Sequence, residues 1–477
     1  MLKKWSLVSA VTLFSAAAAS ASAQNFTALT GATVLNGKGG SIENGVVIIS
    51  DHHITCVGTT KECTIPSGAT KLNFSKHFIT PGLVDSHVHF AQTGWIDGRP
   101  DGIEALDVYP YDETVAQLRE NPDRWHKSYL CSGITAAYDV GGPDWTITDS
   151  HATDTDRPDR VHVRAAGPLI TYASARNRFF QRGEAIQAMF LPMDNDKEVR
   201  ANVAHLKKIG AAAVKVWFLK PAAEREKELD NRLMLVGELA RKAGLPLIVH
   251  STGLREAKVA LRAGARMLVH SVEDKLVDQE FIDLLLKNDA IYAPTLVVGS
   301  NWTRAMASVA ISKPIAVDDP NDCVDNAIMK RIMNPELLKP ALGGRISVRR
   351  AKKMLKNSRR TPSVMYANLR TVFAAGAHVV TATDAGNPLT LHGPSIYSEM
   401  EAMQEAGLTP SQVITAATLK GAEAMGIESK TGSLEVGKLA DLIVMTKDPR
   451  ADIANFRSLS HVMRKGIIKT QSDLKVR

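Results

Sequence analysis

The sequence predicts an α/β protein: a (β/α)8 TIM barrel with a small β-sandwich domain built from both chain termini. Three observations support this fold class. Short apolar runs alternate with helical patterns along the middle of the chain, as they do in a parallel (β/α)8 barrel. Short strands and turns fill residues 26–81, and a similar β pattern returns after residue 430. The 477 residues suffice for one large and one smaller domain.

The first residues have the pattern of a signal peptide, which we assign to residues 1–23. Lys3 and Lys4 precede a short apolar run, and Ala21-Ser-Ala23 forms a small-x-small cleavage site. The apolar run is too short to stay in a bilayer as a permanent anchor, and no later segment is long and apolar enough to cross one. We therefore expect a periplasmic or secreted protein after cleavage near Ala23.

Both ends of the mature chain are expected to build the small β domain, from residues 24–81 and 428–477. The first part contains strand patterns at 28–35, 45–50 and 54–58, with turns between them. This part is too small to bury a good core alone, and the β pattern at residues 440–468 provides the missing strands.

The chain has four cysteines and no Cys-x-x-Cys pair, which excludes thiolate zinc sites and thioredoxin-type redox chemistry. Cys56 and Cys63 flank a short hairpin and could form a disulfide in an oxidising compartment, which the sequence leaves open. Cys131 lies in an apolar stretch, where we expect a buried residue without a chemical role.

Residues 82–427 are assigned to the barrel domain. A long excursion between the last two strands, from Leu296 to Tyr366, is expected to be helical and to cover the barrel mouth. The eight expected strands are Leu83–His89, Ile134–Asp139, His162–Gly167, Ala213–Leu219, Pro246–His250, Met267–His270, Ile291–Thr295 and Val379–Asp384.

The chain is basic, with a formal net charge of +8, of which Lys3 and Lys4 contribute +2. The basic residues concentrate in residues 339–360. This run lacks the aromatic interleaving of nucleic-acid binders, so we expect a solvated helix face and no nucleic-acid partner. Glycine-rich phosphate loops and the Gly-x-Ser-x-Gly nucleophile elbow are also missing from the sequence.

The end of the first expected barrel strand carries His87 and His89. Side chains alternate along a strand, so both imidazoles point the same way, about 7 Å apart along the backbone, and can reach one divalent cation. Asp85 shares this face and is expected to orient a ligating ring. His-x-His alone is weak evidence, because two satisfied strand-end histidines give the same pattern.

Polar side chains interrupt or end four further apolar strands: Lys215, His250, His270 and Asp384. The carboxyl ends of parallel barrel strands meet at one end of the barrel, where barrel enzymes place their chemistry. A lone buried histidine is more often a satisfied core residue, and a buried lysine is costly unless it is paired or modified. Five such ends out of eight favour one shared site.

These residues resemble the metal-dependent amidohydrolase superfamily, in its imidazolonepropionase-like and prolidase-like branch with two metals and a carboxylated lysine. The likeness covers nearly the whole mature chain. It rests on the His-x-His after Pro81-Gly-Leu-Val-Asp85, on Gly210-Ala-Ala-Ala-Val-Lys-Val216, on the single histidines at 250 and 270, and on Thr383-Asp384-Ala-Gly-Asn-Pro388 with His392-Gly393. A returning β segment at Gly432–Val444 completes it.

The resemblance implies two divalent metal ions, with zinc as the expected metal, and N-carboxylated Lys215 as their bridging ligand. His87, His89 and Asp384 would hold one ion, and His250 and His270 the other. Asp384 would also be catalytic, because it would take a proton from the attacking water and deliver it to the leaving amine.

The expected activity is metal-assisted hydrolysis of an amide or peptide bond in a small molecule, such as an N-acyl amino acid or a dipeptide in a prolidase-like or carboxypeptidase-like reaction. A lactonase or phosphotriesterase on the same site is the alternative, and a non-catalytic exported binding protein is a third reading. A one-metal deaminase is disfavoured, since such relatives carry a Glu just after the fifth-strand histidine and need no Lys215. The sequence leaves open whether the protein forms a homo-oligomer.

The sequence departs from the family pattern after the third strand. Related chains often carry a loop rich in glycine and histidine there, whereas this chain reads Gly167–Phe180. Tyr172, Arg176 and Arg178 are substrate candidates in this segment, and an ordinary surface loop is the competing interpretation. His392, after the last strand, is a further candidate for contact with the substrate or the ligands.

Overall fold

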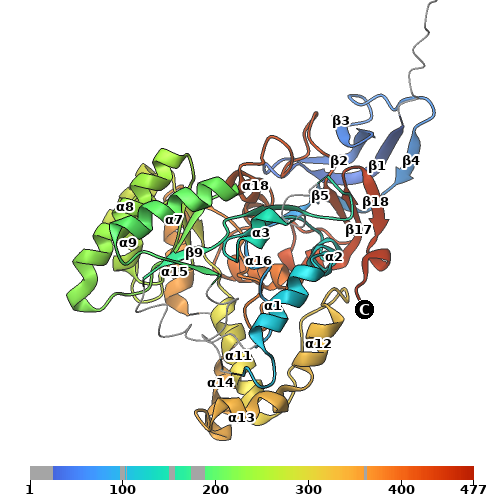
Figure 1. Cartoon of the computed structure of the whole chain (residues 1–477). Helices are drawn as coiled ribbons and strands as arrows, with labels where there is room; N and C mark the ends of the chain where they lie inside the picture. Colours follow the sequence, from blue (N-terminus) through green and yellow to red (C-terminus); the bar gives the residue numbers. More distant parts are fainter. Residues whose placement is uncertain (1–24, 97–102, 104, 150–155, 173–187, 359–361) are drawn as a thin grey trace, which may run out of the picture.

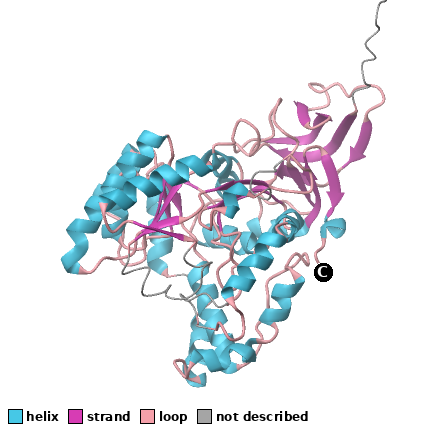
Figure 2. Cartoon of the chain, viewed as in Figure 1, coloured by secondary structure: helices cyan, strands magenta, loops and turns pink. Residues whose placement is uncertain are grey.

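The computed structural model describes residues 25–96, 103, 105–149, 156–172, 188–358 and 362–477. Helices surround two groups of barrel strands, and a separate β sheet lies at the upper right of the view (Figure 1; Figure 2). The expected signal peptide, residues 1–23, lies outside the described residues, as do Arg176 and Arg178.

Strands from both ends of the chain form one eight-stranded sheet. Its path runs β18-β17-β16-β5-β1-β2-β3, and β4 pairs with β1. All the strands belong to this one sheet, so the two layers of the predicted sandwich are not shown. The strands are β1 (Phe26–Leu35), β2 (Ser41–Ser50), β3 (His53–Gly58), β4 (Thr70–Asn73), β5 (Phe78–Pro81), β16 (Leu442–Met445), β17 (Leu459–Arg464) and β18 (Ile467–Thr470).

The centre of this sheet joins distant parts of the sequence. β5 runs parallel to β1 on one side and antiparallel to β16 on the other, with Pro81 opposite Leu442. Gly82 alone then connects β5 to the first barrel strand. A Cβ atom at Gly82 would lie 2.2 Å from Thr135 Oγ1, so this connection requires glycine.

The strands of the middle of the chain, which the sequence assigned to a barrel, form a three-stranded and a seven-stranded parallel sheet that, among the residues the structure describes, do not close into one continuous barrel. All eight strands predicted from the sequence are present, each at or within its expected bounds except the last. The three-stranded sheet contains β6 (Leu83–Val88), β7 (Ile134–Asp139) and β8 (His162–Ala165). The seven-stranded sheet contains β9 (Leu169–Thr171), β10 (Phe190–Pro192), β11 (Val214–Trp217), β12 (Leu247–His250), β13 (Met267–Val269), β14 (Ile291–Ala293) and β15 (His378–Val379).

A few backbone hydrogen bonds outside the strand ladders join the two sheets. Ala212 N donates to Ala165 O at 2.8 Å, between the ends of β8 and β11. On the other side Asp384 N donates to His87 O, also at 2.8 Å. The chain beyond β15 therefore runs beside β6. Small and branched apolar side chains fill the space between the strands, among them Val84, Ala136, Ala213, Ile248 and Val269.

Helices follow most barrel strands and cover them from outside. α7, α8 and α9 stand side by side in Figure 1. α7 and α8 end at Gly210 and Gly244, whose positive φ angles of 83° and 71° suit a helix C-cap. The helices are α1 (Tyr111–Glu120), α2 (Asp123–Cys131), α3 (Trp145–Thr148), α7 (Asp196–Ile209), α8 (Glu226–Ala243), α9 (Leu254–Arg262), α10 (Gln279–Lys287), α15 (Ser363–Ala374), α16 (Ser395–Glu405), α17 (Pro410–Ala416) and α18 (Leu419–Met425).

The excursion after β14 is helical, as predicted. It contains α11 (Val298–Ile311), α12 (Asn326–Ile332), α13 (Lys339–Leu342) and α14 (Val348–Asn357). These helices form the lower part of the molecule in Figure 1, where α14 packs against α11. The first turn of α11 lines the main cavity through Val298 and Gly299.

Two disulfides are present. Cys56 bonds to Cys63, which answers the question that the sequence left open. Cys131 bonds to Cys323, so the expectation that Cys131 has no chemical role was wrong, although the residue is buried. Its partner lies 192 residues away in the helical excursion, a distance at which no local pattern could identify it.

A buried charge cluster fastens the terminal sheet to the barrel. Asp441 lies 3.0 Å from Arg464 Nη1 through one carboxylate oxygen and 2.9 Å from His162 Nε2 through the other. Arg464 Nε also donates to Arg160 O at 2.9 Å. Because Asp441 and Arg464 are almost fully buried, each stabilises a charge that would otherwise lack solvation.

Candidate metal centre

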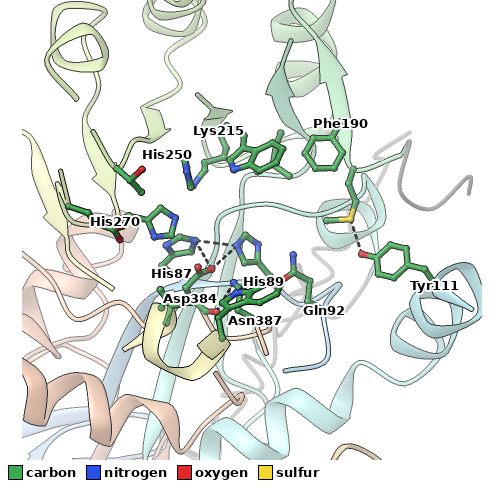
Figure 3. Close-up of a pocket in the computed structure, with 18 residues that line it drawn as sticks. His87, His89, Gln92, Tyr111, Phe190, Lys215, His250, His270, Asp384 and Asn387 are labelled. Atoms are coloured by element: carbon green, nitrogen blue, oxygen red, sulfur yellow. Dashed lines mark hydrogen bonds and ion pairs between the residues drawn. The ribbon is translucent and has the colours of Figure 1, made fainter. Parts of the chain in front are cut away.

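The first ligand group gathers where β6 ends beside the chain after β15. His87 and His89 point to the same side, as the alternation of strand side chains predicts, and their Nε2 atoms lie 3.2 Å apart. Asp384 Oδ1 lies 3.2 Å from His87 Nε2 and 3.0 Å from His89 Nε2 (Figure 3). Three ligand-type atoms thus surround one point.

This donor set fits a divalent cation. Atoms separated by 3.0 to 3.2 Å can each lie ~2.1 Å from one centre at angles of roughly 90–100°. Asp384 Oδ1 is buried and, despite both nearby imidazoles, accepts no hydrogen bond from the described residues. A shared cation would satisfy this oxygen together with the two imidazole nitrogens.

Hydrogen bonds on the far side of two rings direct their other nitrogens inward. His89 Nδ1 lies 2.7 Å from the carbonyl oxygen of Gly141, so Nδ1 carries the proton and Nε2 keeps its lone pair. His270 Nδ1 lies 2.8 Å from Thr295 Oγ1. Metal-ligating histidines in proteins are generally held by this kind of contact.

The second ligand group adjoins the first. The rings of His250 and His270, at the ends of β12 and β13, have centroids 4.4 Å apart, and the ring of His270 is 5.2 Å from that of His87. Ligand atoms of His87, His270 and Asp384 all lie within 4.8 Å of one another. In Figure 3 the four imidazoles, Lys215 and Asp384 gather in one part of the cavity.

The backbone at two of these residues is strained. His270 has a φ of 80° and Asp384 a φ of 64°, which non-glycine residues rarely adopt. Thr295, the hydrogen-bond partner of His270, has a φ of 45°. Such conformations cost about 1–3 kcal/mol each and concentrate at functional sites. The occurrence of three such residues at this one site supports the view that the strained backbone was selected because it places their side chains.

Burial controls the charges of the site. Burial lowers the pKa of Lys215 to about 7, although Asp384 opposes this shift, and the residue is only 2% exposed. Burial and the nearby Lys215 charge lower the pKa of His250 to about 3. Burial likewise holds the pKa values of His87 and His270 well below their usual range. These imidazoles are therefore neutral at pH 7, which is the form that binds metals.

Asp85 supports the site in a different way from the one expected. Its carboxylate accepts hydrogen bonds from the backbone of His87 at 3.3 Å and from the backbone and hydroxyl of Thr383 at 3.1 and 2.6 Å, and not from an imidazole ring. Asp85 thereby ties the His87 segment to the residue before Asp384. Burial raises the pKa of Asp85 to about 7, although the bonds from Thr383 lower it.

One cavity of about 310 Å³ contains all six predicted ligand residues in its wall. Its other described lining residues are mainly apolar or aromatic with a few polar groups: Tyr111, Leu169, Met189, Phe190, Trp217, Val298, Gly299, Trp302, Gln92, Thr252, Glu273 and Asn387. Apolar walls with a few polar groups are typical of small-molecule sites.

Two of these lining residues had a signal in the sequence. Trp217 lies two residues after Lys215 and so shares its face of the strand. Asn387 follows Asp384 in the motif of the last strand, and its amide donates to Asp384 O at 3.1 Å, while its Oδ1 accepts from Trp302 Nε1 at 3.1 Å. The other lining residues come from loops and helices whose orientation no sequence pattern fixes.

Two predicted substrate candidates lie behind the cavity wall. The Tyr172 hydroxyl donates to Leu219 O at 3.2 Å. His392 stacks on Trp125 with ring centroids 3.9 Å apart, and its Nε2 lies 2.8 Å from the carbonyl oxygen of Gln92. His392 therefore supports a lining residue from behind. The remaining candidates, Arg176 and Arg178, lie outside the described residues.

Comparisons with known proteins found both curated relatives and solved structures that are similar to this chain. An imidazolonepropionase from Symbiobacterium thermophilum is 49% identical over 45 residues, which are 9% of this chain and 11% of that protein. The solved structure of a Xaa-Pro dipeptidase with bound methionine has a TM-score of 0.65 at 21% identity, covering 94% of this chain and 100% of that chain. Molinate hydrolase has a TM-score of 0.64 at 22% identity, covering 95% and 96%.

The two structures, at these identities, show a shared fold, while the curated relative is matched over about a tenth of its length. The sequence model of the Amidohydrolase family matches residues 78–469, which is most of the chain. This match starts in β5, the strand before the His-x-His motif, and ends in β18. The chain therefore belongs to the Amidohydrolase family.

Proposed function

We propose that this protein is an exported, metal-dependent hydrolase that cleaves an amide or peptide C–N bond of a small molecule. The observation that carries the proposal is the gathering of six ligand-type side chains, from four strands or the residues directly after them and from the segment after β15, in one cavity wall. The family membership and the fold shared with a Xaa-Pro dipeptidase support the choice of bond. N-acyl amino acids and dipeptides are the proposed substrates, on a (β/α)8 barrel.

The proposed cofactors are two divalent cations, with zinc as the first choice. His87, His89 and Asp384 would hold one ion, and His250 and His270 the other. Lys215, N-carboxylated by carbon dioxide, would bridge them, which turns a buried cation into an oxygen ligand. Such ions supply two effects when bound: the pKa of a coordinated water falls toward about 7, and the scissile carbonyl is polarised.

The residues of the chain would orient the substrate and move the proton. Asp384 accepts a proton from the attacking water at its carboxylate and transfers it to the nitrogen of the departing amine. Water and amide thus yield a carboxylic acid and an amine. The aromatic side chains of Trp217, Phe190 and Trp302 hold the apolar part of the substrate and exclude bulk water.

Two observations bear on the proposed export. Both disulfides agree with an oxidising compartment, since stable disulfides are rare in the cytosol. In the described part of the chain, no helix is both long and apolar enough to span a bilayer. Expression with the leader, cell fractionation and N-terminal sequencing of the product test this part. The proposal requires a chain that starts near Gln24 in the periplasm or medium.

A substrate panel with metal analysis tests the activity. The panel contains N-acyl amino acids, dipeptides, lactones and phosphotriesters, and the metal content is measured on the same preparation. We expect about two ions per chain and the highest kcat/KM on an amide. A higher kcat/KM on a lactone or a phosphotriester would instead identify the protein as a lactonase or a phosphotriesterase. Absence of bound metal, with no activation by zinc, manganese or cobalt, would instead support a binding protein.

A further inference from the structure

A second cavity adjoins the candidate metal centre. It has a volume of about 620 Å³ and shares Glu273 and Gly299 with the first cavity. We call it the outer chamber. Gly299, Ser300 and Thr303 of α11 line one side, and residues of α14 line another. α11 and α14 lie next to each other in Figure 1 and are in contact.

The start of α11, between the two cavities, is firmly anchored. Leu296 N and Val297 N donate to the two carboxylate oxygens of Glu399 at 2.8 and 3.1 Å. Glu399 is fully buried in α16. Leu296 lines the outer chamber, and Val298 two residues later lines the metal cavity. The segment that lies between the two cavities is thus held in place by a fully buried side chain.

One face of α14 turns its basic residues toward the outer chamber. Arg350, Lys353, Met354 and Asn357 line it at the spacing i, i+3, i+4 and i+7, which places them on one side of a helix. The sequence favoured a solvated helix face for this basic run. The structure divides the run, because Arg350 and Lys353 line the chamber while the other basic residues of α14, Arg349, Lys352 and Lys356, do not.

The two cations are available to a ligand. Arg350 and Lys353 are exposed, and within the described residues neither side chain forms an ion pair. Glu273 lines both cavities, and burial, with the nearby Asp274, raises the pKa of its carboxyl group, which favours the neutral form. The charges of Arg350 and Lys353 therefore attract an anion into the outer chamber.

We propose that the outer chamber is a substrate subsite for an oxyanion, such as a carboxylate, that lies several bonds from the scissile amide. This inference rests on the proposed amide hydrolysis and specifies its substrate class. The substrate would be an elongated amide whose apolar part contacts Trp217 and Phe190, while Arg350 and Lys353 hold the distant anion between α11 and α14. Two cations on adjacent turns can share one carboxylate or sulfonate.

A series of N-benzoyl amino acids tests the position of the anion. The probes are N-benzoylglycine, N-benzoyl-γ-aminobutyrate and N-benzoyl-ε-aminocaproate, each compared with its uncharged carboxamide, and the sulfonate analogue of the longest probe. Monoanilides of succinate, adipate and suberate place the carboxylate on the acyl side instead. In one of the two series, the longer acids should exceed their carboxamides in kcat/KM by about tenfold, mainly through KM.

Matched variants assign this preference to the chamber. Arg350→Gln with Lys353→Gln removes two chamber cations, and Arg349→Gln with Lys352→Gln removes two exposed cations of the same helix that do not line it. The first pair should abolish the preference for the acid, so that the acid and its carboxamide have equal kcat/KM values. The control pair should retain it, and raising the salt concentration should weaken it in the wild type.

The outcomes separate this inference from the proposed function. Hydrolysis of acids and carboxamides with equal kcat/KM, or equal effects of the two variant pairs, overturns the subsite and leaves the amide hydrolase standing. Hydrolysis of no amide in the panel overturns the proposed function. In that case, calorimetric binding of N-benzoyl-ε-aminocaproate and of its carboxamide still decides the subsite, because only the acid should bind tighter to wild type than to the chamber variant.

Discussion

Replacing Asp384 by Asn separates its two proposed roles. The side chain keeps its shape and an oxygen near His87 and His89, which lie 3.2 and 3.0 Å from Oδ1. It loses the charge and the ability to accept a proton. A positioned proton-transfer group contributes about 10²–10⁴-fold to rate. We therefore expect kcat to fall roughly a thousandfold, equivalent to about 4 kcal/mol, while more than half of the metal is retained.

Steady-state kinetics and metal analysis on the same preparation measure both effects. Asp139→Asn is the matched control, because Asp139 is a buried carboxylate close to His89 that contacts the backbone of Phe90 and Gly141 and does not line the cavity. Its kcat should change less than about tenfold. Wild-type kcat in Asp384→Asn would refute the proton-transfer role, and a loss of activity in proportion to lost metal would reduce Asp384 to a ligand.

Three further changes test the site and the fold. Lys215→Ala should lower the metal content from about two ions to one, and short carboxylic acids should restore part of the activity; unchanged metal content would contradict the bridging role. Asp441→Asn leaves the buried Arg464 without its counter-charge, so the free energy of unfolding should fall by about 3–5 kcal/mol in denaturant titrations at pH 7. Burial raises the pKa of Asp441, but Arg464, His162 and the backbone of Lys465 together lower it below its usual range; the wild type should lose this advantage as the pH falls below about 4. Cys323→Ser opens the bond to Cys131, whose 192-residue separation gives about 5 kcal/mol in the chain-entropy model; an unchanged melting temperature would show that the bond adds no stability.

The fold could be predicted where local pattern decides it. The eight expected barrel strands are apolar runs, seven of which end in a polar residue or glycine, and the structure contains a strand at each. β9 and β10 were missed because three residues carry no usable periodicity. The sheet that both termini share could be predicted because the β segments at the two ends are too small to be stable alone. Whether these strands form one sheet or the two layers of a sandwich depends on which strands pair, and the sequence does not specify this pairing.

The position of the proposed ligand residues could be predicted from the sequence, whereas the rest of the cavity wall could not. His250, His270 and Lys215 interrupt apolar strands, and such interruptions are costly unless the site uses them. Phe190 and Trp302 look like ordinary core residues in the sequence. Their contact with the cavity depends on how β10 and α11 are placed in the tertiary structure, so no local pattern could identify them.

The pairing of β5 with β16 also sets the order of events during synthesis. Residues 78–81 leave the ribosome about 360 residues before their antiparallel partner at 442–445. Until that partner arrives, one side of β5 is an unpaired strand edge that can recruit other chains. Nascent or truncated polypeptides that end before residue 442 are therefore expected to need a chaperone, and a fusion that delays the C-terminal segment should increase aggregation.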